Sequence, residues 1–96
     1  MNYLQDFLNY VKVEQNLAQN TIFAYSRDLT KYLEYLKTKN IDVLSVSHQD
    51  IGEYLWHRKN ENIGVKSLAR FVVSIKLFHR FLIAEDFTKN DPTINL

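Results

Sequence analysis

The residues that most often carry out chemistry are not spaced here as an active site requires. The three histidines, His48, His57 and His79, form neither an H-x-x-x-H nor an H-x-x-E pattern, and the chain has no cysteine. Gly52 and Gly64 are too few for the usual phosphate-cradling loops. The six tyrosines have no arginine–histidine cluster that would activate a phenol. We therefore predict no catalytic residue, no metal site and no cofactor.

A row of residues between positions 20 and 31 points instead to phosphate binding. At 100° per residue, Asn20, Ala24, Arg27 and Lys31 share one face of a helix, opposite an aromatic stripe. The small residue permits close approach, and the amide and the two cations suit a phosphate backbone and a groove edge. An ordinary solvated helix face is the alternative, because most helices expose such residues.

A second group of cations lies between residues 62 and 84, a segment that contains no acidic residue. Its basic residues lie on the helix face opposite the predicted core or beside that outer face: Lys66, Arg70, Lys76 and Arg80. Ser67 and Ser74 fall at the other edge of the face, and Val73 and Leu77 interrupt it. Exposed apolar side chains among cations tend to contact a partner, either another helix or a base methyl group. A nucleic acid and a protein partner therefore both stay open.

The composition predicts one small globular domain without a membrane partner. The 96 residues are 46% hydrophobic and include only two glycines and one proline, which favours helices around a single core. The net charge of +1 does not by itself indicate a nucleic-acid partner, so the distribution of charge matters more. We expect a cytoplasmic location, because no apolar run approaches the roughly 20 residues of a membrane span and the N-terminus carries acid rather than base.

Apolar residues recur at helical spacing in four segments, and strand-like alternation is absent. The first helix is predicted over about residues 2–14. The second is predicted to run to about residue 39, starting at the capping residues Asn20 and Thr21 or a little earlier, around Ala18. Ser47 and Asp50 form a variant of the capping box before the third helix. The fourth helix is predicted from about residue 66 or 67 to 85.

The apolar stripes of the second and fourth helices define the predicted core. Its expected members are Ile22, Tyr25, Leu29, Tyr32, Leu33, Leu36, Leu68, Phe71, Val72, Ile75, Phe78, His79 and Leu82. His79 is expected to be a packed, hydrogen-bonded histidine. Asp91 and Pro92 stop regular structure, and a short final turn can follow. The prediction is an all-α, compact four-helix domain.

Three ordered stretches carry a resemblance to a known family. They are NLAQNTIFAYSRDL at residues 16–29, SLARFVVSIKLFHRFL at 67–82 and NDPTINL at 90–96. Together they resemble the N-terminal domain of Xer-type tyrosine recombinases, with the XerD branch as the nearest. The resemblance implies a SAM-like orthogonal bundle over residues 1–90, which would form the core-binding domain. Residues 91–96 would begin a linker to a separate catalytic domain.

The resemblance also implies a function. Such a domain packs on one side of double-stranded DNA through its second and fourth helices, while the catalytic domain clamps the other side and carries the tyrosine nucleophile. The chain would then not cut DNA alone; it would position a recombinase that works with partner subunits in a tetramer, in processes such as chromosome dimer resolution.

The predicted DNA-binding residues come from two sources. The family motif places Asn20, Thr21, Arg27 and Arg70 at or near DNA, and it places Tyr25 and Leu29 in the core. Five further candidates follow from their position on a helix face and from their charge: Lys31, Lys66, Ser67, Lys76 and Arg80. The alternative function is a helical protein-interaction module with Val73 and Leu77 as its contact patch.

Overall fold

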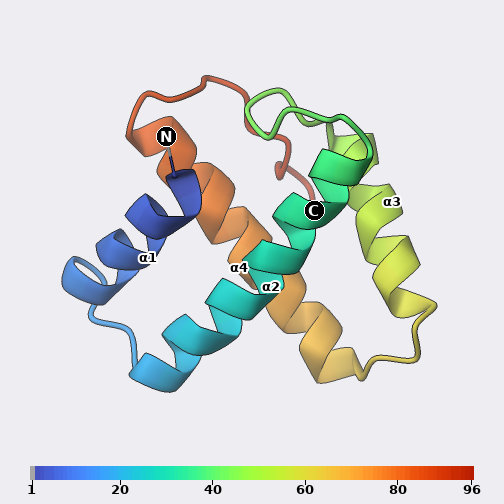
Figure 1. Cartoon of the computed structure of the whole chain (residues 1–96), viewed down its shortest axis with the longest axis horizontal. Coiled ribbons are helices and arrows are strands. Elements are labelled where there is room, and N and C mark those ends of the chain that lie inside the picture. Colours follow the sequence, from blue (N-terminus) through green and yellow to red (C-terminus); the bar gives the residue numbers. More distant parts are fainter. Residues whose placement is uncertain (1) are drawn as a thin grey trace.

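Four α-helices make up the domain in the computed structural model, which describes residues 2–96 (Figure 1). They are α1 (Tyr3–Val13), α2 (Gln19–Thr38), α3 (His48–Lys59) and α4 (Val65–Ala84). The two 20-residue helices, α2 and α4, cross in an X at the centre, with α1 on one side and α3 on the other. No strand occurs among the described residues, so the predicted all-α four-helix fold is confirmed.

One hydrophobic core fills the space around this crossing, and α4 packs against each of the other three helices. Aromatic rings join the layers: Phe7 of α1 meets Phe78 of α4 edge to face, with ring centroids 5.5 Å apart. The most buried apolar side chains come from all four helices and the loop before α3. They are Phe7, Val11, Leu29, Tyr32, Leu36, Val46, Ile51, Tyr54, Phe71, Ile75, Phe78, Phe81 and Leu82.

Several predictions about buried residues are corrected by the structure. Tyr25, Leu68 and Val72 are only half-buried, so they lie at the edge of the core, whereas Leu29 is fully buried. Ser74, predicted at the edge of the basic face, is fully buried because its hydroxyl donates to the carbonyl oxygen of Phe71 at 3.0 Å. This bond to the preceding turn satisfies the hydroxyl inside the helix and allows the small side chain to sit in the core.

The start of α2 matches the earlier of the two predicted positions. The helix begins at Gln19 with Ala18 as its N-cap residue, and no side chain caps it; Asn20 and Thr21 lie in its first turn. Leu17 and Ile22, at the positions of a hydrophobic staple, both pack against the core. Burial of these two side chains sets the entry of the chain into the helix, and it overrides the capping preference of Asn20 and Thr21.

The capping box predicted before α3 is confirmed. The Ser47 hydroxyl accepts from the Asp50 backbone N–H at 3.0 Å, and the Asp50 carboxylate accepts from the Ser47 backbone N–H at 3.0 Å. These two bonds satisfy N–H groups that would otherwise lack partners at the start of the helix. They fix where α3 begins and therefore how it approaches α4.

The chain that follows α4 returns across the loop between α2 and α3. The Thr88 hydroxyl donates to the Leu44 carbonyl at 2.9 Å, and the Asn90 side chain donates to the Val46 carbonyl at 2.9 Å. Pro92 and Thr93 are buried, and a turn follows over residues 92–95. The predicted short final turn is confirmed, and its buried residues attach this segment to the bundle.

Candidate nucleic-acid interface

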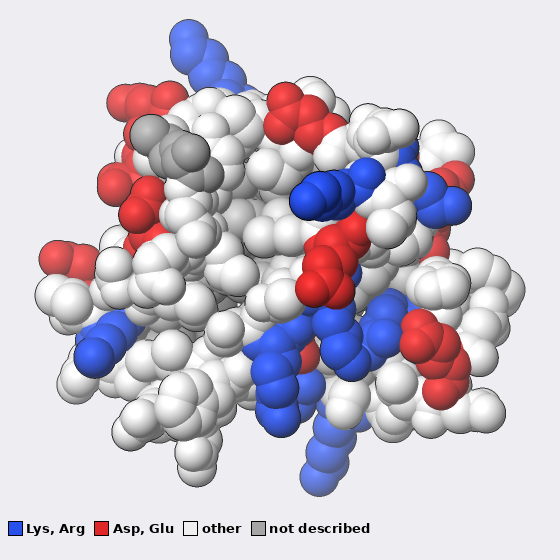
Figure 2. All heavy atoms as spheres, viewed as in Figure 1, with Lys and Arg blue, Asp and Glu red and all other residues white. Residues whose placement is uncertain are grey.

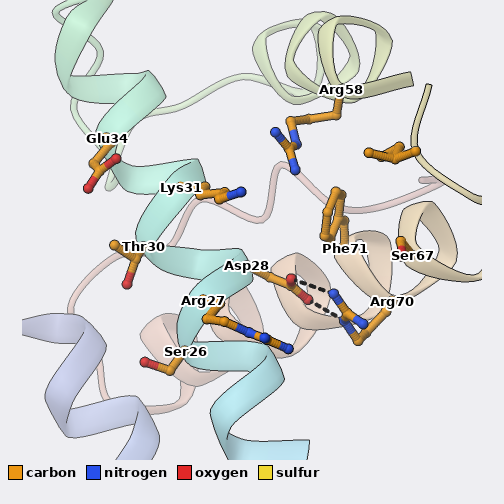
Figure 3. A pocket seen from close by; sticks show the side chains of 11 residues that line it. Ser26, Arg27, Asp28, Thr30, Lys31, Glu34, Arg58, Ser67, Arg70 and Phe71 are labelled. Atoms are coloured by element: carbon orange, nitrogen blue, oxygen red, sulfur yellow. Dashed lines mark hydrogen bonds and ion pairs between the residues drawn. The ribbon is translucent and has the colours of Figure 1, made fainter. Parts of the chain in front are cut away.

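An open groove of about 640 Å³ lies beside the crossing of α2 and α4 (Figure 3). Arg27 and Lys31 enter it from α2, Ser67 and Arg70 from α4, and Arg58 from α3. Two helices that are not adjacent in sequence thus bring together four of the predicted DNA-binding residues. Four cationic side chains and two acidic ones, Asp28 and Glu34, line the groove, which gives it a net positive charge.

Positive charge is also concentrated on the face of the molecule drawn in Figure 2. Several Lys and Arg side chains gather there below and to the right of the place where α2 and α4 cross in Figure 1, with a few acidic side chains among them. Other acidic side chains lie on the upper-left side. Cations therefore concentrate locally beside the crossing, despite a net charge of only +1.

Arg70 is held by a buried carboxylate at the floor of the groove. Its Nε donates to Asp28 Oδ2 at 2.8 Å and its Nη2 donates to Asp28 Oδ1 at 2.9 Å, a bidentate pair between α4 and α2. Asp28 is 5% exposed, whereas the Arg70 side chain is 37% exposed. The hydrogen bonds that Arg70 donates to Asp28 raise the pKa of Arg70, so the guanidinium stays charged. The pair fixes the guanidinium plane, and Nη1 takes no part in it.

Arg58 lies outside both groups of candidate DNA-binding residues in the sequence, yet it lines the groove. Its Nη1 lies 3.0 Å from Glu61 Oε2 in an ion pair. The side chain is nevertheless only 12% exposed, and its guanidinium lies over the Phe71 ring, 4.9 Å from the centroid. Arg70 lies 5.6 Å from the same centroid, so Phe71 carries two cations at the groove floor.

The remaining predicted residues on α2 lie along its exposed face or at its edge. Asn20 is exposed in the first turn and lines a shallow hollow with Phe23, Ser26 and Arg27. Thr21 and Ala24 are half-buried. Arg27 and Lys31 are exposed, as the helical projection predicts. Arg27 lines both the hollow and the groove, so the two form one continuous surface along α2.

The predicted residues on α4 separate into two groups. Lys66 is exposed in the first turn, beside Ser67 and the groove. Lys76 is half-buried, and Arg80 lies ten residues beyond Arg70, in an apolar hollow that α4 shares with α1. At 1.5 Å per residue, Arg80 is about 15 Å along the helix from Arg70. The groove therefore gathers the residues at the start of α4 and excludes those near its end.

The exposed apolar surface available to the alternative function, a protein-interaction patch of Val73 and Leu77, is smaller in the structure than the sequence predicts. Val73 is exposed, but Leu77 is half-buried and packs against the core. Leu77 also lines the α1–α4 hollow rather than the groove. A single exposed valine is ordinary on a protein surface and indicates no partner by itself.

The N-termini of the four helices differ in a way that bears on anion binding. Asn2 caps α1 and Ser47 caps α3, and both helices have an acidic residue in the first turn. Neither α2 nor α4 has a side-chain cap or an acidic residue in its first turn. The free N–H groups and the dipole at such helix starts favour an anion. α2 and α4, which supply most of the groove lining, therefore lack an anionic partner at their own N-termini, whereas α3, which supplies Arg58, has one.

A second polar link between α2 and α4 lies inside the core. The Tyr32 hydroxyl and His79 Nε2 are 2.8 Å apart, and both side chains are fully buried. Burial lowers the pKa of His79 to about 4, although Asp91 acts in the opposite direction, and burial raises the pKa of Tyr32. His79 is therefore the packed, hydrogen-bonded histidine that the sequence predicts, and it is neutral near pH 7.

Comparison with known proteins gives a family for this chain. Residues 4–86 match the model of the phage integrase N-terminal SAM-like domain. A protein named tyrosine recombinase XerD from Oceanobacillus iheyensis is 36% identical over 95 residues, which is 97% of this chain and 32% of the relative.

Proteins of the same name give similar values in two further species. The Staphylococcus epidermidis protein is 39% identical over 92 residues, 95% of this chain and 31% of the relative. The Staphylococcus aureus protein is 37% identical over 94 residues, 97% of this chain and 32% of the relative. The chain spans about a third of the length of these curated relatives. The chain belongs to the family of phage integrase N-terminal SAM-like domains.

Proposed function

We propose that this chain is the core-binding domain of a site-specific tyrosine recombinase and that it grips duplex DNA through α2 and α4. The observation that carries the proposal is the groove where Arg27 and Lys31 of α2 meet Ser67 and Arg70 of α4. A groove built from two helices lets one rigid unit contact phosphates at several points, and phosphate contacts fix the register and orientation of a protein on a duplex.

Three further features support this reading. The start of α2 and the start of α4 both leave N–H groups free for phosphate oxygens. Arg58 adds a cation from α3 at the same groove. The family and the relatives named tyrosine recombinase XerD support a recombinase as the parent protein. The chain itself supplies position and affinity, and we place the strand-cutting chemistry in a separate catalytic domain.

The same proposal extends to the partners of the protein. Residues 91–96 would lead from this domain toward the catalytic domain, with Pro92 and Thr93 attaching the start of that connection to the bundle. The recombinase would assemble with partner subunits as a tetramer on a recombination site, in the cytoplasm. The process would be a site-specific recombination such as chromosome dimer resolution, as the resemblance to Xer-type recombinases implies.

The salt dependence of duplex binding tests the proposal. The purified chain is titrated against a fluorescently labelled duplex at several salt concentrations, and the affinity is measured by fluorescence anisotropy. Affinity should fall steeply with salt, by about 0.9 log unit per tenfold change for each phosphate neutralised. Arg27→Ala and Lys31→Ala should each reduce that slope by about one unit.

The choice of variants follows from the structure. Arg70 also holds Asp28, so its removal disturbs the fold as well as any DNA contact. Arg27 and Lys31 are exposed and form none of the ion pairs seen among residues 2–96, so their loss tests binding alone. Lys12→Ala on α1 is the matched control and should keep the full slope. Binding that is insensitive to salt, or unaffected by both groove variants, would contradict the proposal.

A further inference from the structure

The outer face of α2 contains an aromatic side chain that neither the core nor phosphate binding explains. The exposed residues along this face follow helical spacing and form a ridge: Asn20, Phe23, Arg27, Lys31 and Glu34. Phe23 is 56% exposed. It lies three residues after Asn20 and four before Arg27, so the three side chains are neighbours on the helix surface. They line one shallow hollow together with Ser26.

The flanking residues restrict what this ring can contact. Asn20 and Arg27 offer hydrogen-bond donors on either side, which suit phosphates and base edges. A phenyl ring has no hydrogen-bond donor and cannot bind a phosphate. On this ridge, however, the Phe23 ring would reach the same DNA surface as Asn20 and Arg27. If α2 lies against DNA, Phe23 must therefore meet an apolar part of the duplex. In the major groove that part is the C5-methyl group of thymine.

We propose that Phe23 is a specificity-determining residue that contacts thymine methyl groups in the major groove while Asn20 and Arg27 hold the neighbouring backbone and base edges. This inference rests on the proposed function, because it requires α2 to face DNA. It adds a preference for particular base pairs to a surface on which cations such as Lys31 would contact phosphates without regard to sequence.

The experiment removes the methyl groups and changes nothing else in the chemical structure of the bases. The chain is titrated against an alternating dA–dT duplex and against the same duplex with every dT replaced by dU. Wild-type affinity should be about fourfold weaker for the dU duplex, the ratio that corresponds to the burial of one methyl-sized group. Phe23→Ala should bind both duplexes equally, at about the affinity of wild type for the dU duplex.

A second exposed aromatic residue provides the matched control. Trp56 lies on α3, is exposed, and is absent from both the groove and the hollow. Trp56→Ala should keep the wild-type ratio between the two duplexes. Because Phe23 is exposed, its replacement by alanine should leave the urea unfolding midpoint near that of wild type, which shows that any change in binding is not a loss of folding.

The outcomes separate this inference from the function on which it rests. Salt-dependent binding with equal affinity for both duplexes would overturn the role of Phe23 and leave DNA binding intact. Retention of the wild-type ratio in Phe23→Ala would overturn it as well. No salt-dependent binding to either duplex would overturn the proposed function and this inference together. Loss of the ratio in Phe23→Ala, with the ratio kept in Trp56→Ala, is the result that supports it.

Discussion

Two pairs of polar side chains connect α2 to α4, one charged and partly exposed, the other neutral and buried. Asp28 and Tyr32 are one turn apart on α2, and their partners on α4 are Arg70 and His79. The Asp28–Arg70 pair is charged and opens onto the groove through its half-exposed arginine. The Tyr32–His79 pair is fully buried and neutral near pH 7.

The difference shows how access to water decides the chemistry of each link. In the core, burial raises the pKa of Tyr32 and lowers that of His79, so both groups stay uncharged and share one hydrogen bond, while His79 Nδ1 is buried without a partner among residues 2–96. At the groove, Arg70 keeps contact with water while it neutralises Asp28. A charged pair is tolerated there because only one of its members is fully desolvated.

The largest predicted loss of unfolding free energy follows from removing the arginine of the charged pair. Arg70→Met leaves the Asp28 carboxylate buried and unpaired, which should cost about 3 to 5 kcal/mol of unfolding free energy. Asp28→Asn should cost less, about 1 to 3 kcal/mol, because Arg70 can turn toward water. Urea unfolding of both variants at pH 7 measures the two costs. Equal costs, or a larger cost for Asp28→Asn, would contradict the prediction that an unpaired buried Asp28 destabilises the fold more than an unpaired, partly exposed Arg70.

Acid should weaken the neutral pair, because His79 titrates at a lower pH in the folded chain than in the unfolded chain. The folded pKa of His79, about 4, lies below the unfolded value near 6.5, so between these values the unfolded chain binds a proton that the folded chain does not. Stability is therefore full above about pH 6.5 and falls as the pH drops toward 4, by about 3 kcal/mol in total.

Unfolding free energies measured across this pH range test the prediction. His79→Gln can still bond to Tyr32 but does not titrate, so it should remove most of the slope between pH 6.5 and 4.5. An unchanged slope in that variant would assign the acid sensitivity to other groups.

The smallest effect in the comparison is the loss of the Tyr32 hydroxyl alone. Tyr32→Phe keeps the ring that packs against Tyr54, with centroids 5.3 Å apart, and removes only the bond to His79. It should cost about 1 to 2 kcal/mol, because a buried imidazole nitrogen loses its partner. Thermal unfolding at pH 7 measures this cost, and a loss as large as that of Arg70→Met would contradict the ranking of the two links.

The sequence predicts the helices well because their signals are local. Apolar spacing places all four helices within a few residues of their observed bounds, and the Ser47–Asp50 capping box locates the start of α3. The sequence leaves two possible starts for α2, and the structure has the earlier one, at Ala18, because Leu17 and Ile22 pack against the core, a tertiary event that overrides the capping preference of Asn20 and Thr21.

The site is only partly predictable for the same reason. Helical projection finds Arg27 and Lys31, since exposure on a long helix follows from periodicity. It cannot show that Arg70 pairs with Asp28, 42 residues away, nor that Arg58 folds over Phe71. Those contacts depend on the angle at which α2, α3 and α4 meet, and that angle is set by packing of the whole core.

The most direct test of the central claim is to observe where duplex DNA touches the folded chain. Backbone amide signals of the isotopically labelled protein are followed by NMR while a duplex is added at low salt. If α2 and α4 face DNA, the largest shift changes should fall at the start and outer ridge of α2, from Gln19 to Lys31, and in the first two turns of α4, with α1 nearly unchanged. Shift changes concentrated on α1 or in the α1–α4 hollow, with α2 and the start of α4 unaffected, would contradict it.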